Sequence, residues 1–329
     1  MVLLLLSSLW SLQALPVKNG RRINRSDAVI LPSSQWGEVM YAIPRDLENG
    51  LPIPGIWDSD YGFLIQSTNP ESYALNFPTT GANGLYFYLA IRGDADELTW
   101  EPVTHEGISA TMSYAYAGEN NFTHERCKIY VCVKVRLTGP EAVSQWRNPY
   151  PNRIAKPRLP QTFEIIGRDR EGNEVIKYGF VLQKWFAFRA DYRFHHPEGE
   201  KTFQIQESWC SSLGYRMANI NEVTNAVCID RANGGASYNG CPGDVVSAIP
   251  SSLWWVRDRR INRHDRRIGA GLLTEWGYLA YYDASIPPDW YWARGPAENS
   301  VYAYHVSLAG GQIRIIWKGN DRGAMCVTP

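Results

Sequence analysis

Apolar residues at helical spacing stand out in the stretch that follows residue 200. Ile205, Trp209 and Leu213 fall at i, i+4 and i+8, which predicts a helix with one apolar face. Gly214 comes next, and a glycine in the left-handed conformation is a common way to end a helix. Residues 220–227 repeat the i, i+3, i+7 spacing, which predicts a second, shorter helix.

A pattern typical of strands fills the chain before this helical stretch. Short runs rich in β-branched and aromatic residues alternate with Gly and Pro turns and show no helical period. The runs span residues 84–91, 111–116, 128–137, 163–166 and 175–182. They predict an all-β sandwich over residues 61–183. Residues 16–60 are polar and interrupted by prolines, so we expect them to form an extended lead-in.

The chain past residue 183 mixes the two patterns. After the predicted helices come aromatic loops, and then alternate residues from Tyr302 to Leu308 share one face of a predicted strand. Gly310-Gly311 turns the chain into a partner run at 312–317, which predicts a terminal hairpin. We therefore expect an α+β module over residues 184–329 and a fold that is mostly β overall.

Composition and charge limit the partners. The chain has 329 residues, which suits about two domains. Its 28 Gly and 20 Pro favour short strands and turns over long helices. Lys plus Arg and Asp plus Glu are both 33, so no overall field attracts nucleic acid or an acidic membrane, although a local patch still could. We expect no nucleic-acid partner.

The chain begins with a short apolar run. Residues 2–6 are apolar and are followed by small and polar residues up to 14. This length suits a signal peptide and falls short of the roughly 20 residues that a membrane helix needs. The usual preceding positive charge is missing, since the first lysine is Lys18. A misassigned start codon would explain this, as would a chain that is not secreted. We expect residues 1–15 to be a signal peptide and the protein to be secreted or held at the cell surface.

Six cysteines are present, and their positions suggest three disulfides. The pairs are Cys127 with Cys132, Cys228 with Cys241, and Cys210 with Cys326. The third pair would tie the predicted helix to the end of the chain. Zinc is the competing interpretation, but the chain has no Cys-x-x-Cys and no histidine at ligand spacing from a cysteine. Disulfides also agree with export.

Several separated motifs resemble the C-terminal modules of intimin and invasin family bacterial adhesins. In the second module they are Ser208-Trp209-Cys210-Ser211-Ser212-Leu213-Gly214-Tyr215-Arg216-Met217, Glu275-Trp276-Gly277-Tyr278, Tyr291-Trp292-Ala293, His305-Val306-Ser307-Leu308 and Cys326-Val327. In the sandwich they are Asn76-Phe77-Pro78-Thr79-Thr80-Gly81 and Tyr178-Gly179-Phe180-Val181-Leu182-Gln183-Lys184-Trp185-Phe186. The resemblance implies an immunoglobulin-like sandwich followed by a C-type-lectin-like domain. Members of that family usually begin with a membrane β-barrel, so this chain looks more like a secreted partner that is exported through a separate intimin-like outer-membrane barrel.

Aromatic and arginine clusters supply the candidate binding residues. They are Trp254, Trp255, Arg257, Arg259, Arg260, Arg263, Trp290, Tyr291, Trp292 and Arg294. Aromatic rings make good contact anchors, and arginine forks suit sulfate, phosphate and carboxylate groups. The competing interpretations are core packing for the aromatics and a solvated loop with internal Arg–Asp pairs for the arginines.

Metal and catalytic motifs are weak. Residues 317–321 are similar to the calcium-binding corner of sugar-binding lectins, with Glu298-Asn299 as a poor substitute partner, and a solvated turn is favoured. His195-His196 precedes a Pro-Glu-Gly turn, so an exposed turn is favoured over a metal pair. The chain has no Gly-x-Ser-x-Gly, no His-Glu-x-x-His and no phosphate loop. We expect no metal, no cofactor and no catalysis.

These observations favour a secreted, adhesin-like binding protein. Its ligand would be a host or bacterial surface protein, recognised by loops at about residues 254–300. The alternatives are a secreted virulence-modulating factor without direct adhesion and a lectin that binds a polyanion or glycan. An enzyme related to the formylglycine-generating fold is a further alternative, and it would need reactive cysteines or a metal.

Overall fold

The computed structural model describes residues 37–116, 125–189, 202–228, 246–247, 264–282, 286, 290–296 and 298–328, which all belong to one compact unit, Gln35–Pro329. The protein is mostly β, as the sequence predicts. In the described part of the second half, from residue 184 onward, the α-helices are α2 (Phe203–Ser212), α3 (Ile220–Val223) and α4 (Leu272–Trp276). The short 3₁₀ helices η1 (Pro70–Leu75), η2 (Val143–Gln145) and η4 (Leu279–Tyr281) connect other elements.

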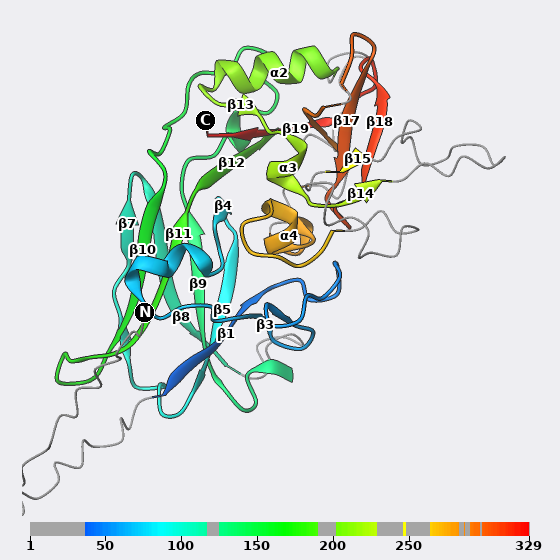
Figure 1. The fold of residues 1–329 in the computed structure, drawn as a ribbon. Helices are drawn as coiled ribbons and strands as arrows, with labels where there is room; N and C mark the ends of the chain where they lie inside the picture. The colour runs from blue at the N-terminus through cyan, green and yellow to red at the C-terminus, as the bar shows by residue number, and fades with distance from the viewer. Residues whose placement is uncertain are drawn as a thin grey trace, which may run out of the picture. The chain divides into compact units, whose positions relative to one another are not determined.

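Two sheets form the sandwich of the first half (Figure 1). The larger has the order β2-β3-β1-β5-β9-β8-β7, and the smaller has the order β11-β10-β6. The strands of the larger sheet are β1 (Glu38–Pro44), β2 (Trp57–Asp58), β3 (Gly62–Leu64), β5 (Tyr86–Arg92), β7 (Val103–His105), β8 (Ile108–Ala115) and β9 (Val131–Thr138). Those of the smaller are β6 (Thr99–Trp100), β10 (Gln161–Arg168) and β11 (Glu174–Leu182). The five strand runs predicted from the sequence match β5, β8, β9, β10 and β11.

The structure differs from the predicted lead-in. Strands β1 and β2 lie within residues 16–60, and β1 pairs antiparallel with β5 in the middle of the larger sheet. Pro44 is the last residue of β1 and lies opposite Phe87. A proline is tolerated at such a boundary because it need not donate to the ladder. Pro44 therefore marks the end of a strand instead of excluding one.

A third sheet forms the second half and has the order β18-β17-β16-β19-β12-β4, with β13 paired to β19. Its strands are β4 (Thr80–Ala82), β12 (Lys184–Arg189), β13 (Arg216–Met217), β16 (Trp290–Ala293), β17 (Tyr302–Ser307), β18 (Ile313–Trp317) and β19 (Gly323–Val327). A separate pair joins β14 (Val227–Cys228) to β15 (Val246–Ser247). The predicted helix and terminal hairpin are confirmed as α2 and β17–β18, whereas the second helix stops at Val223 and Val227 lies in a strand.

The two halves share both a sheet and a core. Strand β4 comes from the first half and pairs in parallel with β12, which follows β11 after one residue. The ring of Phe77 lies 4.8 Å from that of Trp276, and both belong to one cluster of buried apolar side chains. Residue 183 is therefore a crossing between sheets within one packed body.

Two of the three predicted disulfides are confirmed. Cys210 of α2 is bonded to Cys326 of β19, so the first helix of the second half is tied to the last strand. Figure 1 shows α2 lying along β13 and β19; the disulfide joins α2 to β19, and β13 pairs with β19 as a strand. Cys127 is bonded to Cys132 at the start of β9. The predicted pair Cys228–Cys241 lies outside the residues whose side chains are described.

Candidate functional site

The predicted binding aromatics of β16 pack inside the protein. Tyr291 and Trp292 are fully buried, because β16 is a central strand between β17 and β19. Trp290 is partly buried, stacks on His305 with ring centroids 4.2 Å apart, and carries Arg314 at 4.8 Å over its ring. Core packing is therefore the correct interpretation for Tyr291 and Trp292, and neither side chain is open to a ligand.

The other predicted candidates fall in two groups. Trp254, Trp255, Arg257, Arg259, Arg260 and Arg263 lie outside the described residues, as do His195 and His196. Arg294 is described, and its side chain is 51% exposed where the chain leaves β16. Its guanidinium lies 3.0 Å from the carboxylate of Glu207 on α2 and 3.6 Å from that of Glu298.

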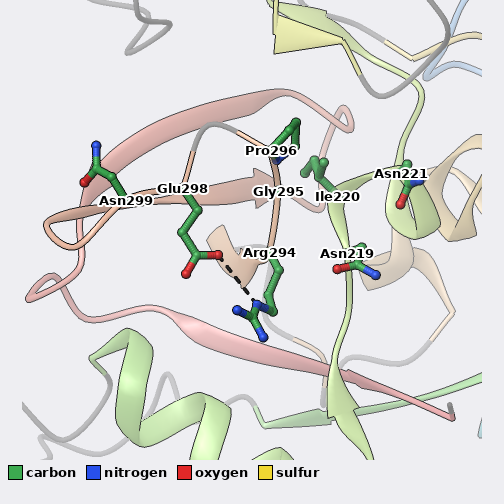
Figure 2. Close-up of a pocket in the computed structure, with 8 residues that line it drawn as sticks. All are labelled: Asn219, Ile220, Asn221, Arg294, Gly295, Pro296, Glu298 and Asn299. Carbon is green, nitrogen blue, oxygen red and sulfur yellow. Dashed lines mark ion pairs between the residues drawn. The ribbon is translucent and has the colours of Figure 1, made fainter.

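Arg294 lines a cavity of about 680 Å³. One wall is the start of α3, with Asn219, Ile220 and Asn221, and the other is the segment after β16, with Arg294, Gly295, Pro296, Glu298 and Asn299. Figure 2 shows Arg294 reaching toward the Glu298 carboxylate, with Asn219 and Asn221 on the α3 side.

Backbone bonds hold the two walls together. The N–H of Ile220 donates to the carbonyl of Arg294 at 2.7 Å, and the N–H of Arg294 donates to the carbonyl of Ala218 at 2.9 Å. At the start of α3, the carboxylate of Glu222 accepts from the N–H of Asn219 at 2.9 Å and from both terminal nitrogens of Arg216. Hydrogen bonds of the main chain thus join the two described walls of the cavity.

Ion pairs balance the charge around the cavity. The Nζ of Lys318 lies 2.8 Å from the carboxylate of Glu298, and both side chains are mostly buried. Lys318 belongs to the 317–321 turn, which the sequence compared with a calcium-binding corner. The structure does place this turn beside Glu298, and the contact between them is the Lys318–Glu298 salt bridge. Among the described residues, no three His, Cys, Asp or Glu side chains are grouped to hold a metal ion.

Sequence reasoning missed an exposed apolar group at the open end of the β17–β18 hairpin. We call Val301, Tyr302 and Trp317 the hairpin-end patch; they are 44%, 47% and 58% exposed. Tyr302 lies directly opposite Trp317, and the N–H of Lys318 donates to the carbonyl of Val301 at 2.9 Å. The Oδ1 of Asn299 accepts from the N–H groups of Val301 and Tyr302, both at 2.8 Å, so the patch adjoins the cavity wall.

The sequence did contain a signal for this patch. Tyr302 is the first of the alternate residues that were predicted to share one face of a strand. Tyr304 and Val306 on that face are buried, whereas Tyr302 is exposed. Tyr302 and Trp317 are the pair farthest from the Gly310-Gly311 turn. The position of Tyr302 and Trp317 at the end of the hairpin far from the turn could therefore have predicted that their side chains are exposed.

Two motifs that carry the family resemblance meet in the interior. The buried carboxylate of Glu275 accepts from the N–H and hydroxyl groups of Thr79 and Thr80, and also from the N–H of Gly269. Burial raises the pKa of Glu275, although the hydrogen bonds act in the opposite direction. The indole N–H of Trp276 donates to the carbonyl of Thr80 at 2.9 Å. These motifs join the two halves and are not exposed to a ligand.

A buried arginine strengthens the same junction. Arg266 donates to the backbone carbonyls of Asp46 and Glu275, and it lies 4.3 Å over the ring of Trp57. Burial lowers the pKa of Arg266 to about 10. The carboxylate of Asp46 accepts a hydrogen bond from the N–H of Tyr278. Asp46 in the first half is thus bonded to two segments of the second half, through Arg266 and through Tyr278. This network has a structural role.

Comparisons with protein-family models, with curated proteins and with solved structures found no match. None of the helices among the described residues combines the length and apolar character that crossing a lipid bilayer requires.

Proposed function

We propose that this protein is an exported binding protein that recognises a protein on a cell surface through the hairpin-end patch. The observation that carries the proposal is the pair Tyr302 and Trp317, two large aromatic side chains exposed side by side on adjacent strands. Contiguous exposed apolar side chains are typical of interaction sites, and Trp and Tyr are enriched among the residues that dominate binding energy.

The surroundings of the patch have the composition of an interface. Polar groups border it, including Asn299 and the Glu298–Lys318 ion pair. An apolar centre with a polar rim is the usual anatomy of a protein–protein contact. The confirmed disulfides suit an oxidising compartment outside the cytoplasm.

The resemblance to intimin and invasin adhesins supports the same proposal. In that scheme the first half is the immunoglobulin-like sandwich and the second is the C-type-lectin-like domain that contacts the ligand. An enzyme of the formylglycine-generating type would need reactive thiols or a metal. Cys127, Cys132, Cys210 and Cys326 are all in disulfides, so titration of free thiols on the unreduced chain would test that alternative through the other two cysteines.

The test is binding of the labelled full-length protein to cultured mammalian cells, measured by flow cytometry. We expect saturable binding that is lost when the cells are first treated with protease. Trp317→Ala and Tyr302→Ala should each lower the affinity by about tenfold or more. Tyr150→Ala is the matched control, because Tyr150 is 84% exposed on a different segment. Absence of saturable binding would refute the function, and equal loss in the control would refute the assignment of the patch.

A further inference from the structure

Among the residues that the structure describes, the charged side chains on and beside the wall of the cavity near α3 pair with one another. Arg294 pairs with Glu207 and Glu298, and Glu298 also pairs with Lys318. Two cations therefore face two carboxylates at distances between 2.8 and 3.6 Å. A charged ligand would have to compete with these pairs, whereas an uncharged polar ligand could use the outward-facing oxygen and nitrogen atoms without breaking them.

Side-chain amides supply the remaining polar groups. Asn219, Asn221 and Asn299 line the cavity from both sides. The Oδ1 of Asn299 is used by the N–H groups of Val301 and Tyr302. The exposed Asn221 amide makes no hydrogen bond with any residue that the structure describes. A planar amide offers a donor and an acceptor side by side, which matches two neighbouring hydroxyl groups.

The backbone around the cavity is already paired. Ile220 bonds to Arg294, and Arg294 bonds to Ala218. The N–H of Glu298 donates to the carbonyl of Gly295 at 3.1 Å. An extended peptide binds by adding to unpaired main-chain groups, and in the described part of the cavity wall these three bonds already occupy groups that such a peptide would use. Of the described lining residues, the apolar side chains are those of Ile220 and Pro296, which offer a small surface for a peptide side chain but enough for one face of a sugar ring.

We propose that this cavity binds an uncharged saccharide without a metal ion. Its volume of about 680 Å³ lies within the range of small-molecule sites, about 300–1,000 Å³. The amide of Asn221, the Arg294 guanidinium and the Glu298 carboxylate hold adjacent hydroxyl groups, and Pro296 packs against the ring. The inference does not depend on the proposed protein contact, because Tyr302 and Trp317 carry that contact whereas Asn221, Arg294 and Pro296 carry this one; Glu298 and Asn299 border both.

The test uses the full chain and ligand-observed NMR with the methyl glycosides of glucose, galactose, mannose and N-acetylglucosamine. We expect at least one of them to bind in the presence of EDTA, with an affinity that changes little as salt is raised. Asn221→Ala should weaken that binding by about tenfold. Alanine is a better helix former than asparagine, so α3 should persist in this variant. Asn152→Ala, at an exposed asparagine on another segment, should change nothing.

A charge variant tests the neutrality argument directly. Glu298→Gln keeps the shape of the side chain and leaves the cavity with one excess positive charge. Binding of sialyllactose should therefore rise roughly two- to fivefold relative to the neutral glycoside at low salt. The proposal is refuted if no neutral glycoside binds, if binding needs calcium, or if Asn221→Ala leaves the affinity unchanged. Loss of cell binding with intact glycoside binding would refute the protein contact alone.

Discussion

Replacing Glu275 with alanine should weaken the junction between the two halves. The carboxylate receives hydrogen bonds from the N–H groups of Thr79, Thr80 and Gly269, and from both threonine hydroxyls. The hydroxyls can rotate to other acceptors, but the three N–H groups are fixed by the main chain. Each buried donor left without an acceptor costs about 1–3 kcal/mol. Since water can enter the space that the side chain leaves, we expect a loss of about 3–5 kcal/mol in the free energy of unfolding.

Urea unfolding followed by tryptophan fluorescence measures this loss, because Trp276 is buried next to Glu275 against Phe77. Glu97→Ala is the matched control. Glu97 pairs with Arg170 at 2.7 Å on the surface, and removing an exposed pair costs less than about 1 kcal/mol. If Glu275→Ala costs no more than Glu97→Ala, the carboxylate does not hold the halves together. A broader or two-step transition in the variant would show the halves unfolding separately.

Two further predictions concern cross-linking and pH. Replacing Cys210 and Cys326 by alanine opens a loop of 116 residues and should lower the free energy of unfolding by about 5 kcal/mol in the chain-entropy model. The same change at Cys127 and Cys132, which are five residues apart, should lower it by about 2 kcal/mol. The urea midpoints of the two double variants check this order. Burial lowers the pKa of His305 to about 3. The unfolded chain binds that proton more readily, so stability should fall as pH drops from about 6.5 toward 3, by up to about 1.4 kcal/mol per unit. His305→Gln should remove that slope in urea titrations at several pH values, and an unchanged slope would contradict the assignment.

Local patterns were enough to predict the elements that have one buried face. Helix α2 follows from the spacing of Ile205, Trp209 and Leu213; Trp209 and Leu213 are buried as predicted, whereas Ile205, one turn earlier, is 40% exposed. The pairing of Cys210 with Cys326 follows from a cysteine beside that face and another in an apolar final strand. The β17–β18 hairpin follows from alternation on both sides of a Gly-Gly turn. For α2 and the hairpin the signal lies within a few residues, whereas the two cysteines are 116 residues apart and were paired from the local pattern around each.

Contacts between distant segments could not be read in this way. Thr79 and Glu275 are 196 residues apart, and only packing of both halves brings them together. The parallel pairing of β4 with β12 also arises only when the two halves of the chain pack together. The burial of Tyr291 and Trp292 also depends on the neighbours of β16, since an aromatic strand looks alike whether it is central or at an edge. Two of the predicted binding aromatics, Tyr291 and Trp292, therefore belong to the core, whereas Trp254 and Trp255 lie outside the described residues.

The shared core has a consequence for recognition. Because β4 and β12 are in one sheet and Phe77 contacts Trp276, the second half loses part of its core and a strand neighbour if the first half is removed. The hairpin-end patch and the cavity lie on this second half, on short segments that are hydrogen-bonded to strands. A surface fixed in this way needs little ordering when it binds, which leaves more of the contact energy for affinity. We therefore propose that the first half holds the hairpin-end patch and the cavity in one conformation, so that the proposed binding should be tested on the whole chain.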